Sequence, residues 1–149
     1  GRLMKLSTRS RYGVRLMTRL AMNHAKGAVL MKDISRMEGI SEKYLGQIII
    51  PLRGAGLVTG RRGAGGGYTL NRKPSDITVR DIVEVLEGDI SLVPCIGDPE
   101  SCSRMGACAA TNVWKKLADD VGRVLGSYTL KDLAEEARRK AANSTEYSI

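Results

Sequence analysis

Three cysteines carry the most distinctive chemistry of this sequence. Cys95, Cys102 and Cys108 lie within one 14-residue window, and the 149-residue chain has no other cysteine. Because the number is odd, they cannot all pair within the chain, and their spacing matches neither close-paired zinc sites nor the Cys-x-x-Cys redox motif. Three thiolates in one loop favour an iron–sulfur cluster, whose ligands are mainly thiolates. The spacing alone leaves open three unrelated cysteines or a structural zinc ion.

The charge of the chain is divided unevenly along its length. Residues 1–74 carry 15 Lys and Arg against 3 Asp and Glu, whereas residues 75–149 carry 9 against 13. The formal net charge of the whole chain is +8. A basic half joined to an acidic half is typical of proteins in which one half lies on a polyanion, although a well-solvated surface would also explain it.

Composition narrows the class of protein further. An apolar content of 42% suits one domain, or a small domain with an appended element. No apolar run approaches the roughly 18 residues of a membrane span, and the basic start lacks the apolar stretch of a signal peptide. We expect Met4 to be the natural initiator. With one histidine and no visible nucleophile–base pair, the chain is expected to be a cytoplasmic protein that is not an enzyme and has no membrane partner.

The first half of the chain has the pattern of a helix-turn-helix unit. Apolar residues recur at helical spacing from Ser7 to about His24, and a second helix is expected from Met31 to Glu38, ended by Gly39. Ser41 is the expected N-cap of a third helix, in which Pro51 should kink or shorten the last turn. Its apolar stripe consists of Tyr44, Leu45, Ile48, Ile49 and Leu52.

The pattern changes after the third helix. Residues 57–59 and 68–70 read as paired strands, and the intervening glycine-rich segment predicts a flexible basic tip, so this hairpin is a wing. A phosphate-binding loop would need Lys-Ser/Thr and a helix after the glycines, whereas a strand follows them here. This pattern argues against nucleotide binding. Thr78 should cap a fourth helix that ends at Gly88. Asp89 to Ala107 reads as a loop, followed by helices over about 109–125 and 130–140, with Asn143 to Ile149 frayed.

These elements position the candidate DNA contacts. The third helix of such a unit enters the major groove with its N-terminal residues against base edges. Gln47 can pair bidentately with adenine, whereas Ser41 and Lys43 suit phosphates. Arginines at a wing tip suit the narrow minor groove. The predicted DNA-binding residues, with Arg15 as a further backbone candidate, are Arg9, Arg11, Ser41, Lys43, Tyr44, Gln47, Arg61 and Arg62.

The helix after the cysteine loop carries a stripe of apolar residues. They step by three or four positions, as in a short coiled-coil seam, and an exposed stripe of this kind is an association site. Two-fold pairing is the commonest closure of such a site. The residues predicted to form a homodimer seam are Val113, Leu117, Val121 and Val124.

Several motifs, in order, resemble the IscR/NsrR/CymR family of bacterial winged-helix transcriptional repressors. They are Met4-Lys5-Leu6-Ser7-Thr8-Arg9 with Arg11-Tyr12-Gly13, then Ile40-Ser41-Glu42-Lys43-Tyr44-Leu45, Gly56-Leu57-Val58 and Arg62-Gly63-Ala64-Gly65-Gly66-Gly67-Tyr68. The resemblance covers roughly Met4 to Glu136 and is closest to the IscR branch. It implies a [2Fe–2S] cluster held by the three cysteines, control of iron–sulfur assembly genes, a double-stranded DNA operator and a homodimer formed through the long helix.

Two departures from the family pattern affect what can be transferred. IscR-type proteins often place a histidine ligand three residues after the third cysteine, where this chain has Thr111, and nitric-oxide-sensing relatives use an aspartate where it has Arg11. The fourth ligand is therefore open among Asp98, Glu100, Ser10, Thr111 and an external thiol. In the reading helix, Gly46 takes the place of a glutamate, so site discrimination between the cluster-bound and cluster-free forms should work differently here, or not at all through this position.

The sequence as a whole predicts a mainly α fold with a small β-hairpin. Residues 4–88 should form a winged helix-turn-helix DNA-binding domain, residues 89–108 a cluster-binding cysteine loop, and residues 109–140 a dimerisation helix with a short C-terminal helix. The expected function is a transcriptional regulator that senses iron–sulfur cluster status. A nitric-oxide or redox sensor of the same fold, and a structural zinc module, are the alternatives.

Overall fold

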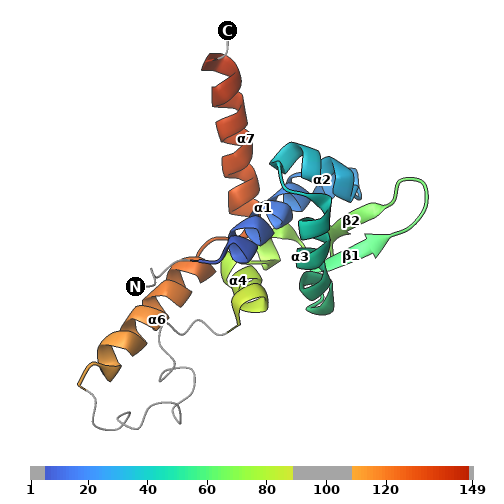
Figure 1. Cartoon of the computed structure of the whole chain (residues 1–149). Coiled ribbons are helices and arrows are strands. Elements are labelled where there is room, and N and C mark those ends of the chain that lie inside the picture. Colours follow the sequence, from blue (N-terminus) through green and yellow to red (C-terminus); the bar gives the residue numbers. More distant parts are fainter. Residues whose placement is uncertain (1–5, 89–108, 148–149) are drawn as a thin grey trace.

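The chain folds into a mainly helical unit with one two-stranded hairpin (Figure 1). This computed structural model describes residues 6–88 and 109–147, so the three cysteines and the whole predicted loop lie outside the described residues. The elements in chain order are α1 (Thr8–Met22), η1 (His24–Lys26), α2 (Met31–Glu38), α3 (Glu42–Gly54), β1 (Val58–Arg61), β2 (Gly67–Leu70), η2 (Pro74–Asp76), α4 (Val79–Glu87), α6 (Thr111–Gly126) and α7 (Leu130–Tyr147).

Local capping chemistry defines the helix-turn-helix. The Ser7 hydroxyl accepts a hydrogen bond from the backbone N–H of Ser10 at the start of α1. Gly39 ends α2 in the left-handed conformation, with φ 67°, and its N–H bonds to the Ser35 carbonyl. Ser41 then caps α3. The predicted bounds of α2 and the predicted N-cap of α3 are confirmed.

The sequence predicts that Pro51 kinks or shortens the last turn of α3, and the shortening does not occur. The helix continues to Gly54, and Leu52, which follows the proline, is fully buried. Burial of that side chain in the core holds the last turn in place, so tertiary packing outweighs the local preference of proline.

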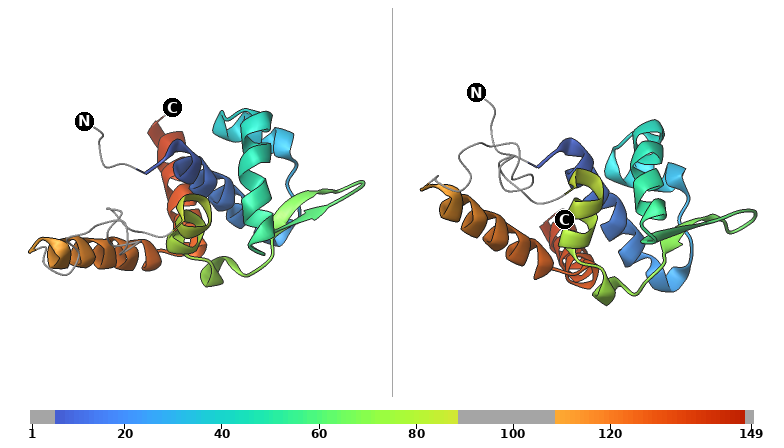
Figure 2. Two further views of the ribbon diagram at one scale, coloured as in Figure 1. Left: turned by 60° about the horizontal axis from the view of Figure 1, so that its bottom comes forward. Right: turned by 90° about the horizontal axis from the view of Figure 1, so that it is seen from below.

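The wing is an antiparallel hairpin attached to the segment before α2. Val58 pairs with Leu70 at the base of the hairpin and Arg61 pairs with Gly67 near the tip. Val29 adds an isolated bridge, because its N–H and C=O bond to the C=O and N–H of Tyr68 at 2.9 and 2.8 Å. The hairpin is therefore held through Tyr68 of β2, while its tip projects away from the helices (Figure 2).

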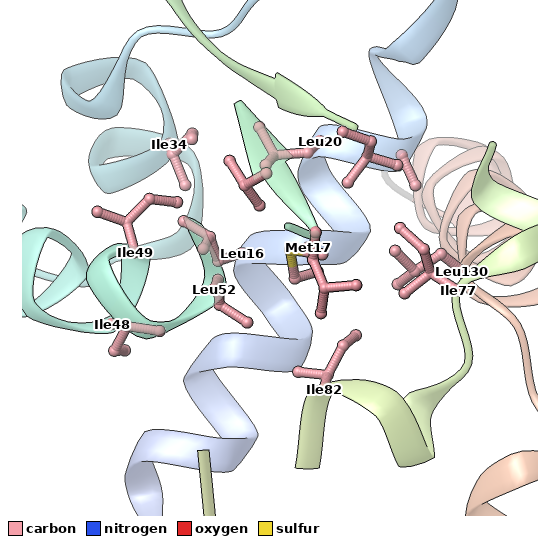
Figure 3. Close-up of a cluster of buried hydrophobic side chains, with 14 of the residues drawn as sticks. Leu16, Met17, Leu20, Ile34, Ile48, Ile49, Leu52, Ile77, Ile82 and Leu130 are labelled. Atoms are coloured by element: carbon pink, nitrogen blue, oxygen red, sulfur yellow. The ribbon is translucent and has the colours of Figure 1, made fainter. Parts of the chain in front are cut away.

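A single core lies where α1 crosses the other helices (Figure 3). Leu16 and Met17 of α1 have no exposed surface, and Leu130 at the start of α7 is equally buried. The other large side chains with less than 2% exposure are Leu20, Ile34, Leu45, Ile48, Leu52, Ile77 and Ile82. Because α7 supplies Leu130 and Ala134 to this core, the C-terminal helix packs onto the winged unit.

The beginning of α4 and the end of α6 are held together. Val79 N–H bonds to the Tyr128 carbonyl, and Leu130 N–H bonds to the Ile77 carbonyl, each at 2.9 Å. The Arg80 side chain lies against Gly122 of α6, and a Cβ built on Gly122 would be 3.0 Å from Arg80 Nη1. A side chain at position 122 would therefore have to displace the Arg80 guanidinium.

The C-terminal helix is longer than predicted. It runs to Tyr147, so the prediction that residues from Asn143 onward fray is wrong for residues up to 147. Glu136 pairs with Arg139 and Lys140 at helical spacing, and no glycine or proline follows to end the helix. None of the helices in the described part of the chain has both the length and the apolar character needed to span a membrane.

Candidate nucleic-acid interface

The outer face of α3 presents a row of exposed side chains. Lys43, Gln47 and Ile50 recur at helical spacing, and all three are exposed. The opposite face is filled by the buried Leu45, Ile48, Ile49 and Leu52. The structure thus places the predicted contacts Lys43 and Gln47 where a groove-bound helix would need them.

The N-terminal end of α3 is supported by α1. The exposed Ser41 uses its hydroxyl oxygen to accept the Tyr44 N–H at 3.1 Å, which leaves its own O–H group able to donate. The Tyr44 ring packs edge-on against Tyr12, with centroids 5.7 Å apart. Tyr44 is therefore half-buried and positions the helix, in addition to its predicted place at the interface.

A partly buried ion pair holds the end of α2 against α1. The Glu38 carboxylate, 13% exposed, accepts Arg15 Nε at 3.2 Å and Arg19 Nη2 at 2.6 Å. Arg15 also donates to the Glu38 carbonyl and lies 5.3 Å from the Tyr12 ring centre. The sequence suggested Arg15 as a backbone contact, but its guanidinium is engaged inside the helix-turn-helix scaffold.

Two glycines shape the wing tip. A Cβ on Gly66 would lie 2.7 Å from the carbonyl oxygens of Arg61 and Gly63, and Gly67, at φ 132°, would place one 2.4 Å from the Val29 carbonyl oxygen. Any other residue would open the turn or displace its anchor. The tight tip leaves Arg61 and Arg62 exposed, as the sequence predicted for minor-groove contacts.

A groove of about 380 Å³ separates the wing from the helix-turn-helix. Its walls are the start of α2, the end of α3 and the wing, and three of its lining residues are Arg53, Arg61 and Arg62. A strand of DNA backbone between a helix in the major groove and a wing in the minor groove would need a basic channel at this place.

The start of α1 is held by the last turn of α4. Glu87 Oε1 accepts the Ser7 N–H at 2.9 Å and the hydroxyl of the fully buried Ser10 at 2.7 Å. Hydrogen bonds from Ser7, and then from Ser10, lower the pKa of Glu87. Arg9 and Arg11 are exposed beside this contact, and Arg11 donates to the Thr8 hydroxyl at 3.0 Å.

The predicted dimer seam lies on the face of α6 turned away from its own chain. Val113 and Val124 are 58% and 55% exposed, and Leu117 and Val121 are half-buried. Ala118 and Gly122 form the buried face of the helix, which packs beside α4. In Figure 2, α6 projects from the body on the side opposite the wing.

The predicted metal ligands Cys95, Cys102 and Cys108 lie outside the described residues. Within the described ranges, no cluster of three or more His, Cys, Asp or Glu side chains could hold a metal ion. Two of the fourth-ligand candidates are described. The Ser10 hydroxyl is occupied by Glu87, and Thr111 is 7% exposed at the start of α6.

Sequence reasoning missed Arg53 and Ile50 at this face. The signal for Ile50 is the run Ile48-Ile49-Ile50, because a helix cannot bury three consecutive side chains on one stripe. Arg53 lies three residues beyond Ile50, and only the fold of the hairpin brings it beside the wing: its guanidinium lies close to Gly60.

Comparison with known proteins agrees with this arrangement. The family model Rrf2, described as an iron-dependent transcriptional regulator, matches residues 6–136. The HTH-type transcriptional regulator CymR of Bacillus subtilis is 45% identical over 131 residues, which cover 88% of this chain and 90% of that protein. Its solved structure, described as that of the global cysteine regulator, superposes with a TM-score of 0.75 over 90% of this chain and 98% of its own, at 43% identity.

Two further relatives are similar over the same length. Protein rrf2 of Nitratidesulfovibrio vulgaris is 42% identical over 134 residues, covering 90% of this chain and 89% of that protein. The structure of IscR from T. potens has 40% identity and a TM-score of 0.74, covering 90% of this chain and 88% of that one. The expected preference for the IscR branch is not visible in these identities, because the values for CymR are higher.

The matched family consists of transcriptional regulators, so the expectation that the chain is not an enzyme is confirmed. With a family model that matches residues 6–136 and relatives above 40% identity over about 90% of its length, this chain belongs to the Rrf2 family of winged-helix, DNA-binding transcriptional regulators.

Proposed function

We propose that this regulator binds a double-stranded DNA operator as a homodimer and senses iron–sulfur cluster status through Cys95, Cys102 and Cys108. In this proposal residues 4–88 bind DNA, residues 89–108 hold the cluster and residues 109–140 form the dimer. The observation that carries the DNA-binding part is the shared face of α3 and the wing, where Lys43, Gln47, Arg61 and Arg62 are all exposed. Helix α3 would enter the major groove and the wing tip the adjacent minor groove.

The chemistry of the three cysteines fits an iron–sulfur cluster. Thiolates are the soft ligands that such clusters take, and three of them lie together in this sequence. A bound cluster would supply a redox-active and oxidation-sensitive group. The resemblance of the sequence motifs to the IscR branch implies a [2Fe–2S] cluster and control of iron–sulfur assembly genes, and the matched family model is described as an iron-dependent transcriptional regulator.

The chain's own residues suggest how this segment would affect DNA binding. It joins the end of α4 to the start of α6, so cluster binding there would act on both helices. At the end of α4, Glu87 holds Ser7 and Ser10 of the first DNA-binding helix. A change at residues 89–108 is therefore expected to alter the placement of α1 and of the two reading helices in the dimer.

Two substitutions test the DNA-binding surface. Arg62→Ala should weaken binding and reduce the slope of log K against log salt by about one, if Arg62 neutralises one phosphate. Gln47→Ala should lose about 1–3 kcal/mol at the cognate site and relax the preference for one base. Lys131→Ala, an exposed cation on α7, is the matched control and should change neither quantity. Unchanged affinity and slope in Arg62→Ala would remove the wing from the interface.

The cluster is tested on protein purified without oxygen. Iron and inorganic sulfide should be present together, and replacing Cys95, Cys102 or Cys108 singly with Ala should remove the visible absorption while the protein stays folded. Zinc without sulfide would favour the structural zinc alternative. A different cluster type in the Mössbauer spectrum would favour the nitric-oxide or redox sensor.

The dimer is tested at the centre of the α6 stripe. Leu117→Asp would place one carboxylate per chain in an apolar seam, so this variant should sediment as a monomer and lose operator binding. Asn112→Asp, an exposed position on the same helix, is the control. A Leu117→Asp protein that remains dimeric would show that the subunits meet elsewhere.

A further inference from the structure

Ile50 is the most exposed large apolar side chain among the described residues. It is 68% exposed, compared with 45% for Met37 and 42% for Leu30 on or beside α2. It lies in the C-terminal half of α3, the helix that should enter the major groove. An isolated apolar residue on a surface needs no explanation in general, but its position on a reading helix is informative.

Folding of the chain does not require this side chain. The core face of α3 is already occupied by Leu45, Ile48, Ile49 and Leu52, which are 0–3% exposed. A β-branched residue is also slightly less favourable in a helix than Leu, Lys or Gln. Ile50 therefore adds neither burial nor helix stability.

The surroundings of Ile50 are polar and open. Gln47 lies three residues before it and Lys43 seven, on the same outer row, and Gly46 lies one turn before it. A Cβ built on Gly46 would meet no atom within 4 Å, so the helix surface one turn before Ile50 is open. Arg53 and the wing arginines add positive charge nearby, which suits a polyanion better than an apolar protein surface.

We propose that Ile50 is a specificity-determining residue that contacts the 5-methyl group of a thymine in the major groove. This inference deepens the proposed function and depends on α3 lying in that groove. The thymine methyl is the one apolar group that the base edges present there, and apolar side chains recognise it by contact. Ile50 follows Gln47 by a rise of about 4.5 Å, so the thymine should lie about one or two base pairs from the adenine that Gln47 reads.

The test removes one methyl group at a time. A duplex that the wild-type protein binds is first selected from a random-sequence library, and each thymine of one half-site is then replaced by deoxyuridine. At one position the replacement should raise the wild-type Kd about fourfold, the effect expected for one buried methyl group. Ile50→Ala should bind the thymine duplex about fourfold or more weakly and should no longer distinguish thymine from deoxyuridine at that position.

The control separates this contact from a general loss of binding. Met37→Ala removes an exposed apolar side chain from α2 and should keep the full deoxyuridine penalty. Thermal unfolding of Ile50→Ala should match the wild type, because the residue is outside the core. Ile50→Val, which retains part of the apolar surface, should keep part of the discrimination.

The outcomes distinguish this inference from the proposed function. If selection yields no preferred sequence, the DNA-reading role of α3 fails, and this inference fails with it. If a preferred duplex is found but no thymine-to-deoxyuridine change alters the wild-type Kd, DNA binding stands and the Ile50 contact is refuted. A penalty that persists unchanged in Ile50→Ala refutes it equally.

Discussion

The ion pair between Glu38 and Arg19 should be a measurable part of the stability of this fold. Glu38 is 13% exposed and Arg19 27%, and Arg19 Nε and Nη2 lie 2.9 and 2.6 Å from Glu38 Oε2. Hydrogen bonds to charged groups contribute about 1.5–3 kcal/mol when partly buried, whereas exposed pairs contribute about 0–1 kcal/mol. Arg15, 45% exposed, belongs to the weaker class. We therefore expect Glu38→Ala to lower the free energy of unfolding by about 2–3 kcal/mol.

A double-mutant cycle in urea isolates the pair. Arg19→Met and Glu38→Gln should show a coupling energy of about 1–2 kcal/mol. The matched control is the pair Arg36–Asp33, whose atoms are 3.4 Å apart and whose side chains are 77% and 37% exposed. Its coupling should be close to zero. Equal coupling in the two cycles would refute the reasoning that burial of Glu38 strengthens its bonds and that this contact fixes α2 against α1.

Three further predictions follow from local geometry. The hydrogen bonds that Glu87 accepts lower its pKa in the folded state, so they stabilise the fold above the ordinary carboxyl pKa. Glu87→Gln should therefore be less stable than the wild type at pH 7, and the difference between their urea midpoints should close as the pH falls below about 4. Gly46→Ala should raise the free energy of unfolding by up to about 1 kcal/mol in thermal melts, because the new Cβ meets no atom within 4 Å. Gly67→Ala should lose roughly 1–3 kcal/mol and speed hydrogen exchange at the amides of Val29 and Tyr68, because its φ of 132° and the Val29 carbonyl leave no room for a side chain.

Features set by local chemistry could be predicted to the residue. Gly39 and Thr78 are recognisable from sequence, because a left-handed helix end and a side-chain cap depend on neighbouring residues alone. The full length of α7 could not be predicted, because no such local signal marks its end. No glycine or proline follows Lys140, so the sequence gives no boundary at the true end of the helix.

Contacts between distant segments could not be predicted in this way. Arg15 reads as a free cation on α1 until the fold brings Glu38, 23 residues away, against it. The role of Gly122 likewise depends on Arg80 from another helix. The direction in which the apolar stripe of α6 faces also depends on the packing that buries Ala118 and Gly122.

The contacts of Arg80 with Gly122 and Gly126 hold α6 near its C-terminal end, so a tilt of the helix would pivot about that end. The hydrogen bonds of Val79 and Leu130 fix that end, whereas Thr111, at the far end, adjoins the cysteine segment. A helix of 16 residues is about 24 Å long, so a tilt of about 10° about its C-terminal end moves its tip by about 4 Å. In a two-fold dimer formed through α6, the displacement of each copy of the helix would change the distance between the two reading helices.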